Sequence, residues 1–246
     1  MSPVAMPPPR NLRSKFFLWT SAAALTIVFA GFARSYYLHG LFGRPPLPLL
    51  LHLHGAVMSS WFALLAVQSI LVARGYPRLH RTLGWIGVGL AAIIVSLGLF
   101  VAIHAAVRDL PDPKLGSIFF LGADIAMVLL FGGIFAAAVA VRRRSETHKR
   151  LVLLATLCIL PTAIGRLPGM GAVVPVILGT AAVAMVCAGA DAWRHRRLHA
   201  VFAWGVPLVV GTLYLAFEAA QSQAWTNLAT HLLSSSRNKS WSCTGP

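Results

Sequence analysis

Seven apolar runs follow one another along the chain, and polar or charged residues separate them. They cover residues 16–38, 47–73, 83–107, 115–141, 151–167, 172–193 and 198–220. An apolar run of about 20 residues crosses the hydrocarbon core of a bilayer as an α-helix, and the fifth run only just reaches that length. The pattern therefore predicts an all-α membrane protein built as a seven-transmembrane-helix bundle, residues 16–220, with Pro161 kinking the fifth helix.

The two ends of the chain do not follow this pattern. Residues 1–15 are rich in Pro and basic side chains, which predicts a disordered tail. The first run is longer than the apolar core of a signal peptide and has no A-x-A site after it, so we expect the first helix to be retained. Within 221–246, apolar residues recur at i, i+3, i+4 and i+7 from Trp225 to Leu232, which predicts an interfacial segment followed by a loose tail.

Composition agrees with a membrane protein. Hydrophobic residues make up 57% of the chain and charged residues 11%, whereas soluble domains carry about 25% charged residues. The net charge of +15 comes from short basic clusters between apolar runs, which indicates topology signals, and we expect no nucleic-acid partner. Abundant Arg, Ala and Gly beside few Lys are typical of a GC-rich bacterial genome, so the bacterial inner membrane is the expected location.

The basic clusters also predict an orientation. Fourteen of the 21 Lys and Arg residues fall in the N-terminal segment and in the second, fourth and sixth loops. An excess of Lys and Arg marks the cytoplasmic side of a membrane protein. The N-terminus is therefore expected in the cytoplasm and the C-terminus outside.

Ionisable side chains inside a membrane are costly and indicate function. With the expected topology they gather in the outer half of the bundle: His52, His54, His104, Asp124, Arg166 and Glu218. At 100° per residue, His54 shares a helix face with Trp61 and Gln68, while His52 points nearly the opposite way. Glu218 shares a face with Tyr214 and Gln221. Both polar faces are expected to point into the bundle.

Four interpretations of this outer cluster stay open. In the first, His54 or His52 and His104 are the axial ligands of a b-type haem, with Arg166 beside a propionate and a redox partner in the membrane. In the second, a metal ion is held by His54, His104, Asp124 and Glu218. In the third, Asp124 and Glu218 titrate in a path for protons or a small solute, extended by Gln68. In the last, Arg166 pairs with Asp124 or Glu218 in a purely structural subunit.

Three cytoplasmic boundaries look alike. RLHRTLG, ETHKRLVLL and RLHAVFAWG place His80, His148 and His199 at the entry of an outgoing helix. A ring of imidazoles could bind a metal or a lipid headgroup. Capping of backbone groups at a helix start explains the same pattern and is the favoured interpretation.

The string FGRPPLPLLLHLHGAVMSSWFALLAVQSILVA, followed by LHRTLGW and RRRSETHKRLVLLAT, resembles bacterial polytopic integral membrane proteins with no assigned activity. This resemblance covers about residues 36–168 and implies a multi-pass membrane protein. A looser similarity to cytochrome b561-type proteins rests on paired intramembrane histidines and implies haem b. The chain has no second pair of histidines in the inner half of the membrane. The similarity therefore implies at most one bound haem, and not the two haems of a complete electron path.

Overall fold

The computed structural model describes residues 10–43, 45–111 and 116–241, and within these ranges every regular element is a helix. The elements are α1 (Arg10–Phe32), η1 (Ala33–Tyr37), η2 (His39–Phe42), α2 (Leu49–Ala73), α3 (Pro77–Arg108), α4 (Ser117–Ala140), α5 (Ser145–Ile159), α6 (Pro161–Ile164), α7 (Val173–His195), α8 (Ala200–Ala220) and α9 (Gln223–Trp241). The all-α class predicted from the sequence is confirmed.

Six helical segments of the described chain are long and apolar enough to cross a membrane. They are α1 with η1 from Phe16 to Tyr37, and α2, α3, α4, α7 and α8. The chain therefore has the features of a multi-pass membrane protein. The remaining apolar run is divided, because α5 ends at Ile159 and α6 begins at Pro161. The predicted disturbance at Pro161 is confirmed: its ring has no N–H to continue the helix.

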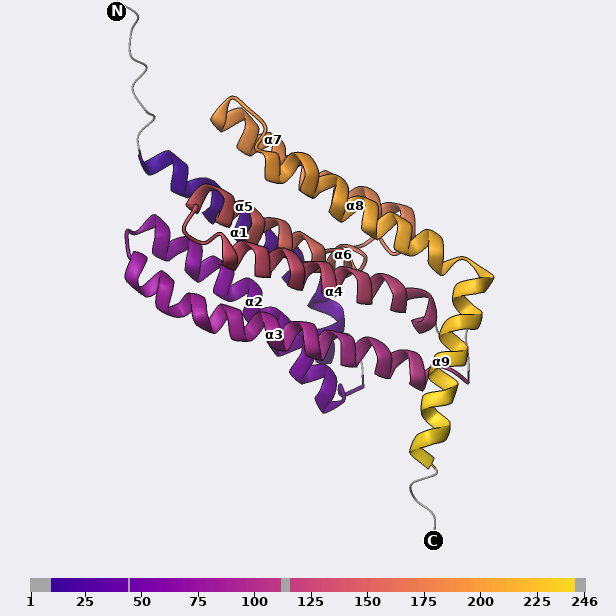
Figure 1. Cartoon of the computed structure of the whole chain (residues 1–246). Helices are drawn as coiled ribbons and strands as arrows, with labels where there is room; N and C mark the ends of the chain where they lie inside the picture. Colours follow the sequence, from indigo (N-terminus) through magenta and orange to yellow (C-terminus); the bar gives the residue numbers. More distant parts are fainter. Residues whose placement is uncertain (1–9, 44, 112–115, 242–246) are drawn as a thin grey trace, which may run out of the picture.

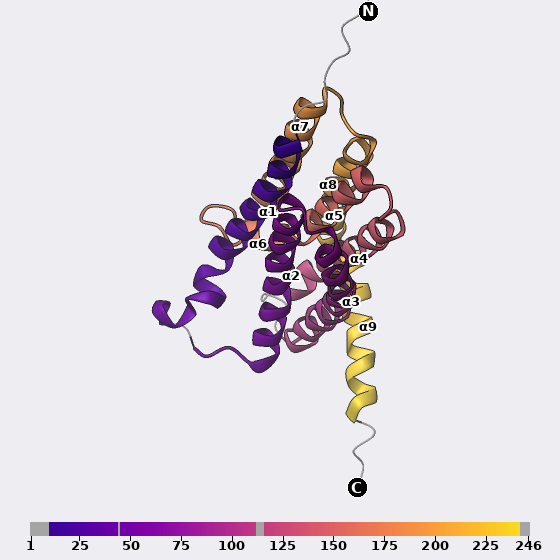
Figure 2. The same cartoon turned by 90° about the vertical axis from the view of Figure 1, so that its left-hand side faces the viewer.

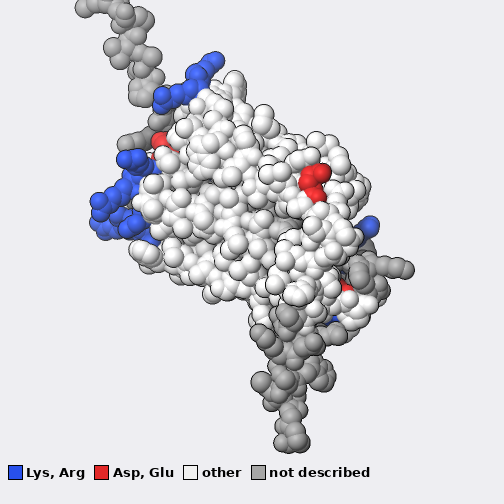
Figure 3. All heavy atoms as spheres, turned by 45° about the vertical axis from the view of Figure 1, so that its right-hand side comes forward, with Lys and Arg blue, Asp and Glu red and all other residues white. Residues whose placement is uncertain are grey.

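The turns that join α2 to α3, α4 to α5 and α7 to α8 lie at one end of the bundle (Figure 1), which we call the basic end. Lys and Arg side chains gather at this end, while the face beside it is almost free of charge (Figure 3). We call the opposite end, where α2 begins and α8 stops, the distal end.

The core forms around α5, which packs against α4, α7 and α8. Leu154, Phe131, Phe202 and Leu213 are almost completely buried there. Large apolar side chains on the outer surface stay exposed instead: Trp193 is 77% and Trp19 70% accessible. Exposed apolar surface on this scale marks contact with lipid or another protein.

The ends of the described chain differ from the sequence expectation. α1 begins at Arg10, inside the stretch expected to be disordered, and residues 1–9 lie outside the described part. The expected interfacial segment belongs to α9, which continues to Trp241 and extends away from the bundle (Figure 2). The indole N–H of Trp225 anchors this helix by donating to the Ile118 carbonyl oxygen at 3.0 Å. Residues 242–246 of the expected loose tail also lie outside the described part.

Candidate functional site

Three of the polar residues predicted for the outer half come together at the distal end. Arg166, just after α6, lies close enough to Asp124 on α4 and to His54 on α2 to interact electrostatically with both. We call His54, Asp124 and Arg166 the outer polar site. Its members come from three separate parts of the sequence, so the fold is what assembles it.

A packed aromatic layer lies on the inner side of this site. Trp61 is 3% accessible and meets Phe131 edge to face, with 4.9 Å between ring centroids. Its indole N–H donates to Thr156 Oγ1 of α5 at 3.2 Å. His54 and Asp124 each precede a member of this layer by two helical turns, about 10.5 Å of rise. The layer therefore separates the outer polar site from the rest of the bundle.

Asp124 faces inward and is nevertheless accessible. It shares a helix face with Val128 and Phe131, which are buried, yet its own side chain is exposed although protein atoms surround it on most sides. No ion pair or hydrogen bond to its carboxylate is present among the described residues. The Asp124 carboxylate therefore keeps accessible surface beside the buried residues of its own helix face.

Arg166 is held without using its full hydrogen-bonding capacity. One guanidinium nitrogen donates to the Thr162 carbonyl oxygen at 2.7 Å, and the group lies 4.6 Å from the centroid of the Phe32 ring. Its side chain is exposed. Because a guanidinium has five N–H donors, Arg166 retains donors for a ligand near Asp124.

The two histidines of the LHLHG motif have different surroundings, as their opposite directions predict. His54 lies in the outer polar site, and its buried Nδ1 has no hydrogen-bond partner. His52 is exposed, with its ring 6.1 Å from that of His39. The two imidazoles therefore do not form one chelating pair.

His104 and Glu218 are not brought into the outer polar site. His104 is exposed and stacks on Phe100 of its own helix, with 5.9 Å between ring centroids. On α8, Leu213 and Phe217 are buried while Tyr214 and Glu218 are exposed, so the expected inward orientation of the Glu218 face is not observed. In the described part of the chain, no group of three or more His, Cys, Asp or Glu side chains could hold a metal ion.

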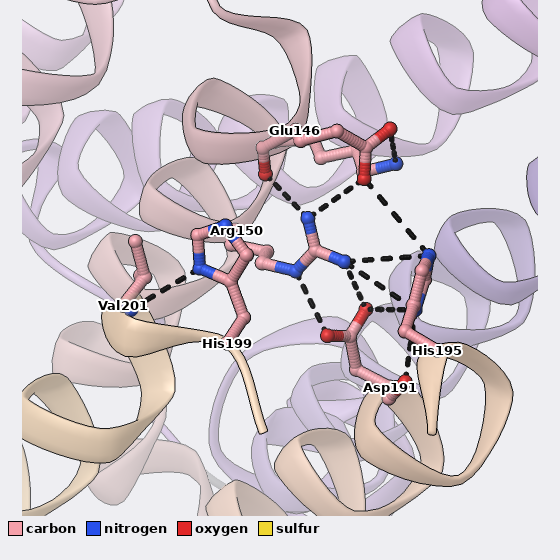
Figure 4. A network of polar contacts seen from close by, with 7 residues as sticks. Glu146, Arg150, Asp191, His195, His199 and Val201 are labelled. Carbon is pink, nitrogen blue, oxygen red and sulfur yellow. Dashed lines mark hydrogen bonds and ion pairs between the residues drawn. The ribbon is translucent and has the colours of Figure 1, made fainter. Parts of the chain in front are cut away.

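The most fully connected polar network lies at the basic end (Figure 4). Arg150 of α5 is 1% accessible and donates to both carboxylate oxygens of Asp191 on α7, at 2.8 and 2.9 Å. A third nitrogen donates to the carbonyl and the carboxylate of Glu146, at 2.7 and 2.8 Å. His195 Nδ1 lies 2.9 Å from the Asp191 carbonyl oxygen, and Lys149 donates to Glu146 at 2.7 Å. This network joins α5 and α7 at the basic end of the bundle.

Sequence reasoning missed this network because Arg150 was counted among the topology-setting basic residues. Two signals were available: Glu146 precedes Arg150, and Asp191 precedes His195, each by four residues, the spacing that places charged side chains together on one helix face.

The three boundary histidines play separate structural roles. His199 is the N-cap of α8 and its Nδ1 accepts from the Val201 N–H at 3.2 Å. His148 Nδ1 lies 2.8 Å from the Ala138 carbonyl oxygen at the end of α4, whereas His80 Nδ1 is buried without a partner. The contacts of His148 and His199 agree with the capping interpretation of the repeated motif.

Comparison with protein-family models, with curated proteins and with solved structures finds no match for this chain. The class that fold and site define is thus an all-helical protein with six helices able to cross a membrane and an accessible His, Asp and Arg cluster at its distal end. The resemblance to bacterial polytopic membrane proteins stays a prediction.

Proposed function

We propose that this protein is a bacterial inner-membrane transporter that moves a small anionic solute together with a proton, using the outer polar site as its binding site. The observation that carries the proposal is Asp124: an inward-facing carboxylate that is accessible, lies near Arg166 and His54, and has no ion pair among the described contacts.

The proposal includes a seventh membrane crossing besides the six long apolar helices. This crossing is formed by the divided apolar run of α5 and α6, which connects α4 to α7. α5 is shorter than a usual transmembrane helix, but its neighbours α4, α7 and α8 bury it, so it meets little lipid. An odd number of crossings places the two termini on opposite sides of the membrane.

Charge at the basic end sets the orientation in this proposal. Three of the interhelical turns at that end carry Lys or Arg clusters, as the positive-inside rule requires of cytoplasmic loops. The N-terminus is then cytoplasmic and the outer polar site opens toward the outside. A solute from the cell exterior would reach Asp124 and Arg166 before it met the layer formed by Trp61 and Phe131.

Each member of the outer polar site has a chemical role. Arg166 offers several N–H donors in a plane, the geometry that suits a carboxylate or another oxyanion. Asp124 has no donor of its own to stabilise its charge, and the buried Nδ1 of His54 has no partner, so a carboxylate and an imidazole are available there for proton uptake. Binding of an anion at Arg166 would favour protonation of Asp124 because two negative charges would otherwise lie close together.

Haem binding receives less support from the same geometry. A bis-imidazole haem needs two rings that face each other across one cavity. His54 lies near Arg166, whereas His104 is exposed and stacked on Phe100. We expect the purified protein to be colourless. A Soret band that sharpens on dithionite reduction and disappears in His54→Ala would instead favour the haem interpretation.

The transport proposal is tested in liposomes that hold the full-length protein and a trapped pH-sensitive dye. Equal potassium on both sides with valinomycin holds the membrane potential near zero, and an inward gradient of chloride, phosphate or succinate drives entry of the anion with its proton. We expect anion-stimulated proton uptake that Asp124→Asn abolishes and Arg166→Gln makes insensitive to the anion.

Glu218→Gln is the matched control, because Glu218 is an exposed carboxylate at the distal end that lies outside the site. Uptake should be unchanged in this variant. Uptake no faster than in empty liposomes with all three anions, or equal loss in Asp124→Asn and Glu218→Gln, would show that the outer polar site does not carry the function.

A further inference from the structure

A second polar hollow lies at the basic end, far from the outer polar site. It is a pocket of about 230 Å³ between the start of α5 and the turn from α7 to α8. Glu146, Arg150, His195, Arg197 and His199 line it. Figure 4 shows four of these side chains converging from the two segments.

The acidic groups near this pocket are already neutralised. Both oxygens of the Glu146 carboxylate are engaged, one by Lys149 at 2.7 Å and the other by Arg150 at 2.8 Å. Burial raises the pKa of Glu146, but these two cations outweigh it and bring the pKa to about 2. Asp191 is paired with Arg150 in the same way. An incoming anion therefore meets carboxylates whose charge is compensated.

Two donors around the pocket are uncommitted. Nδ1 of His199 accepts the Val201 N–H at 3.2 Å, which fixes the neutral tautomer with its proton on Nε2. No contact of Nε2 is present among the described residues, so this N–H is available as a donor. Arg197 is exposed, and the contacts described for the chain include no partner for its guanidinium.

The position of the pocket adds to its preference for anions. His199 is the N-cap of α8, a helix of 21 residues, and the N-terminal end of a helix carries partial positive charge. The pocket also lies between the ends of α7 and α8, where a bilayer crossed by these two helices would place its phospholipid phosphates. Donors from an arginine and an imidazole beside a helix N-terminus form the usual environment of a bound phosphate.

We propose that this pocket binds a phosphate group, with Arg197 and the Nε2–H of His199 as its donors and the buried pair of Arg150 and Asp191 as the frame that positions them. The phosphate can belong to an anionic lipid headgroup or to a soluble phosphate, and the two sources share this chemistry. The proposal stands apart from transport at the outer polar site, because it uses different residues at the other end of the bundle.

The test is calorimetric titration of the full-length protein in a maltoside detergent, which carries no phosphate. Inorganic phosphate is one probe and a short-chain phosphatidylglycerol is the other. We expect at least one probe to bind, with an affinity that falls roughly tenfold in Arg197→Gln, the loss expected for a charge-assisted hydrogen bond. His199→Asn should weaken binding as well, and since Asn is a good N-cap the start of α8 is retained.

Arg196→Gln is the matched control, because Arg196 is adjacent, carries the same charge and does not line the pocket. Its variant should bind as the wild type does. Binding of phosphatidylglycerol alone would assign the site to a lipid, and binding of inorganic phosphate that the lipid does not displace would assign it to a soluble ligand. The proposal is overturned if neither probe binds, or if Arg196→Gln weakens binding as much as Arg197→Gln.

Discussion

Arg150 and Asp191 lie 41 positions apart in the sequence and form two parallel hydrogen bonds, at 2.8 and 2.9 Å, with both side chains withdrawn from solvent. This bidentate contact fixes the start of α5 against the end of α7. The guanidinium matches the carboxylate geometrically, and Glu146 satisfies a further nitrogen, so the cost of burying two charges is offset.

Asp191→Asn should be strongly destabilising. The substitution removes the buried counter-ion of Arg150 and leaves only the half-exposed Glu146 carboxylate beside it, and breaking a buried ion pair typically costs about 3 kcal/mol or more. Thermal unfolding of the purified protein in detergent is the measurement. Glu146→Gln removes a carboxylate that is 53% accessible, and the expected loss there is below about 1 kcal/mol. Similar unfolding temperatures for the two variants would mean that the buried pair contributes little.

The bond between Trp61 and Thr156 gives a second prediction. Thr156→Val leaves the indole N–H of Trp61 buried without an acceptor, a loss of about 1–2 kcal/mol. Thr180→Val is the control, because Thr180 is equally buried but its hydroxyl bonds only to the Val176 carbonyl of its own helix. Unfolding temperature and tryptophan emission are measured together. A greater effect of Thr180→Val would exclude the interhelical bond as the cause.

Gly31 allows α1 and α6 to approach closely. A Cβ atom on Gly31 would collide with the Ala163 carbonyl oxygen, which is backbone and cannot rotate away. Gly31→Ala should therefore cost about 2 kcal/mol, as overpacking usually does. Gly211→Ala in α8 meets nothing within 4 Å, and its expected effect is neutral or slightly stabilising. Equal stability of the two variants, measured by thermal unfolding, would contradict this account of the α1–α6 contact.

The stability of the protein should fall in mild acid, partly through His199. Burial, and then the nearby charge of Arg150, lower the pKa of His199 below its ordinary value of 6.5. The unfolded chain therefore takes up this proton more readily, and stability is lost as the pH falls from about 6.5 toward the lowered value. His199→Asn should show a smaller decrease in unfolding temperature between pH 7 and pH 5 (roughly the window in which histidine titrates).

His231→Asn serves as the comparison for this pH series, because His231 is exposed on α9, away from the Arg150 network. Its acid response should match that of the wild type. An unchanged response in His199→Asn would assign the pH dependence to other histidines.

Much of the fold was predictable because lipid imposes one simple requirement on each spanning segment, a continuous apolar length. This requirement located the helices that contain His54, Asp124 and Glu218 to within a few residues. It does not fix the rotation of a helix about its axis, which depends on the packing of its neighbours. The inward direction predicted for His54 agrees with its place beside Arg166, whereas the inward direction predicted for the Glu218 face was wrong, because Tyr214 and Glu218 are exposed.

The division of the helix at Pro161 also bears on how Arg166 is positioned. Pro161 has no N–H to offer the Leu157 carbonyl, so the helical hydrogen bonding is interrupted between α5 and the segment that follows. After this interruption, Ala163 packs against Gly31 and the Arg166 guanidinium lies over the Phe32 ring. Gly31 and Phe32 both belong to α1. Contacts with α1 rather than with α5 therefore position Arg166. A change in the tilt of α1 would change the distance between the Arg166 guanidinium and Asp124.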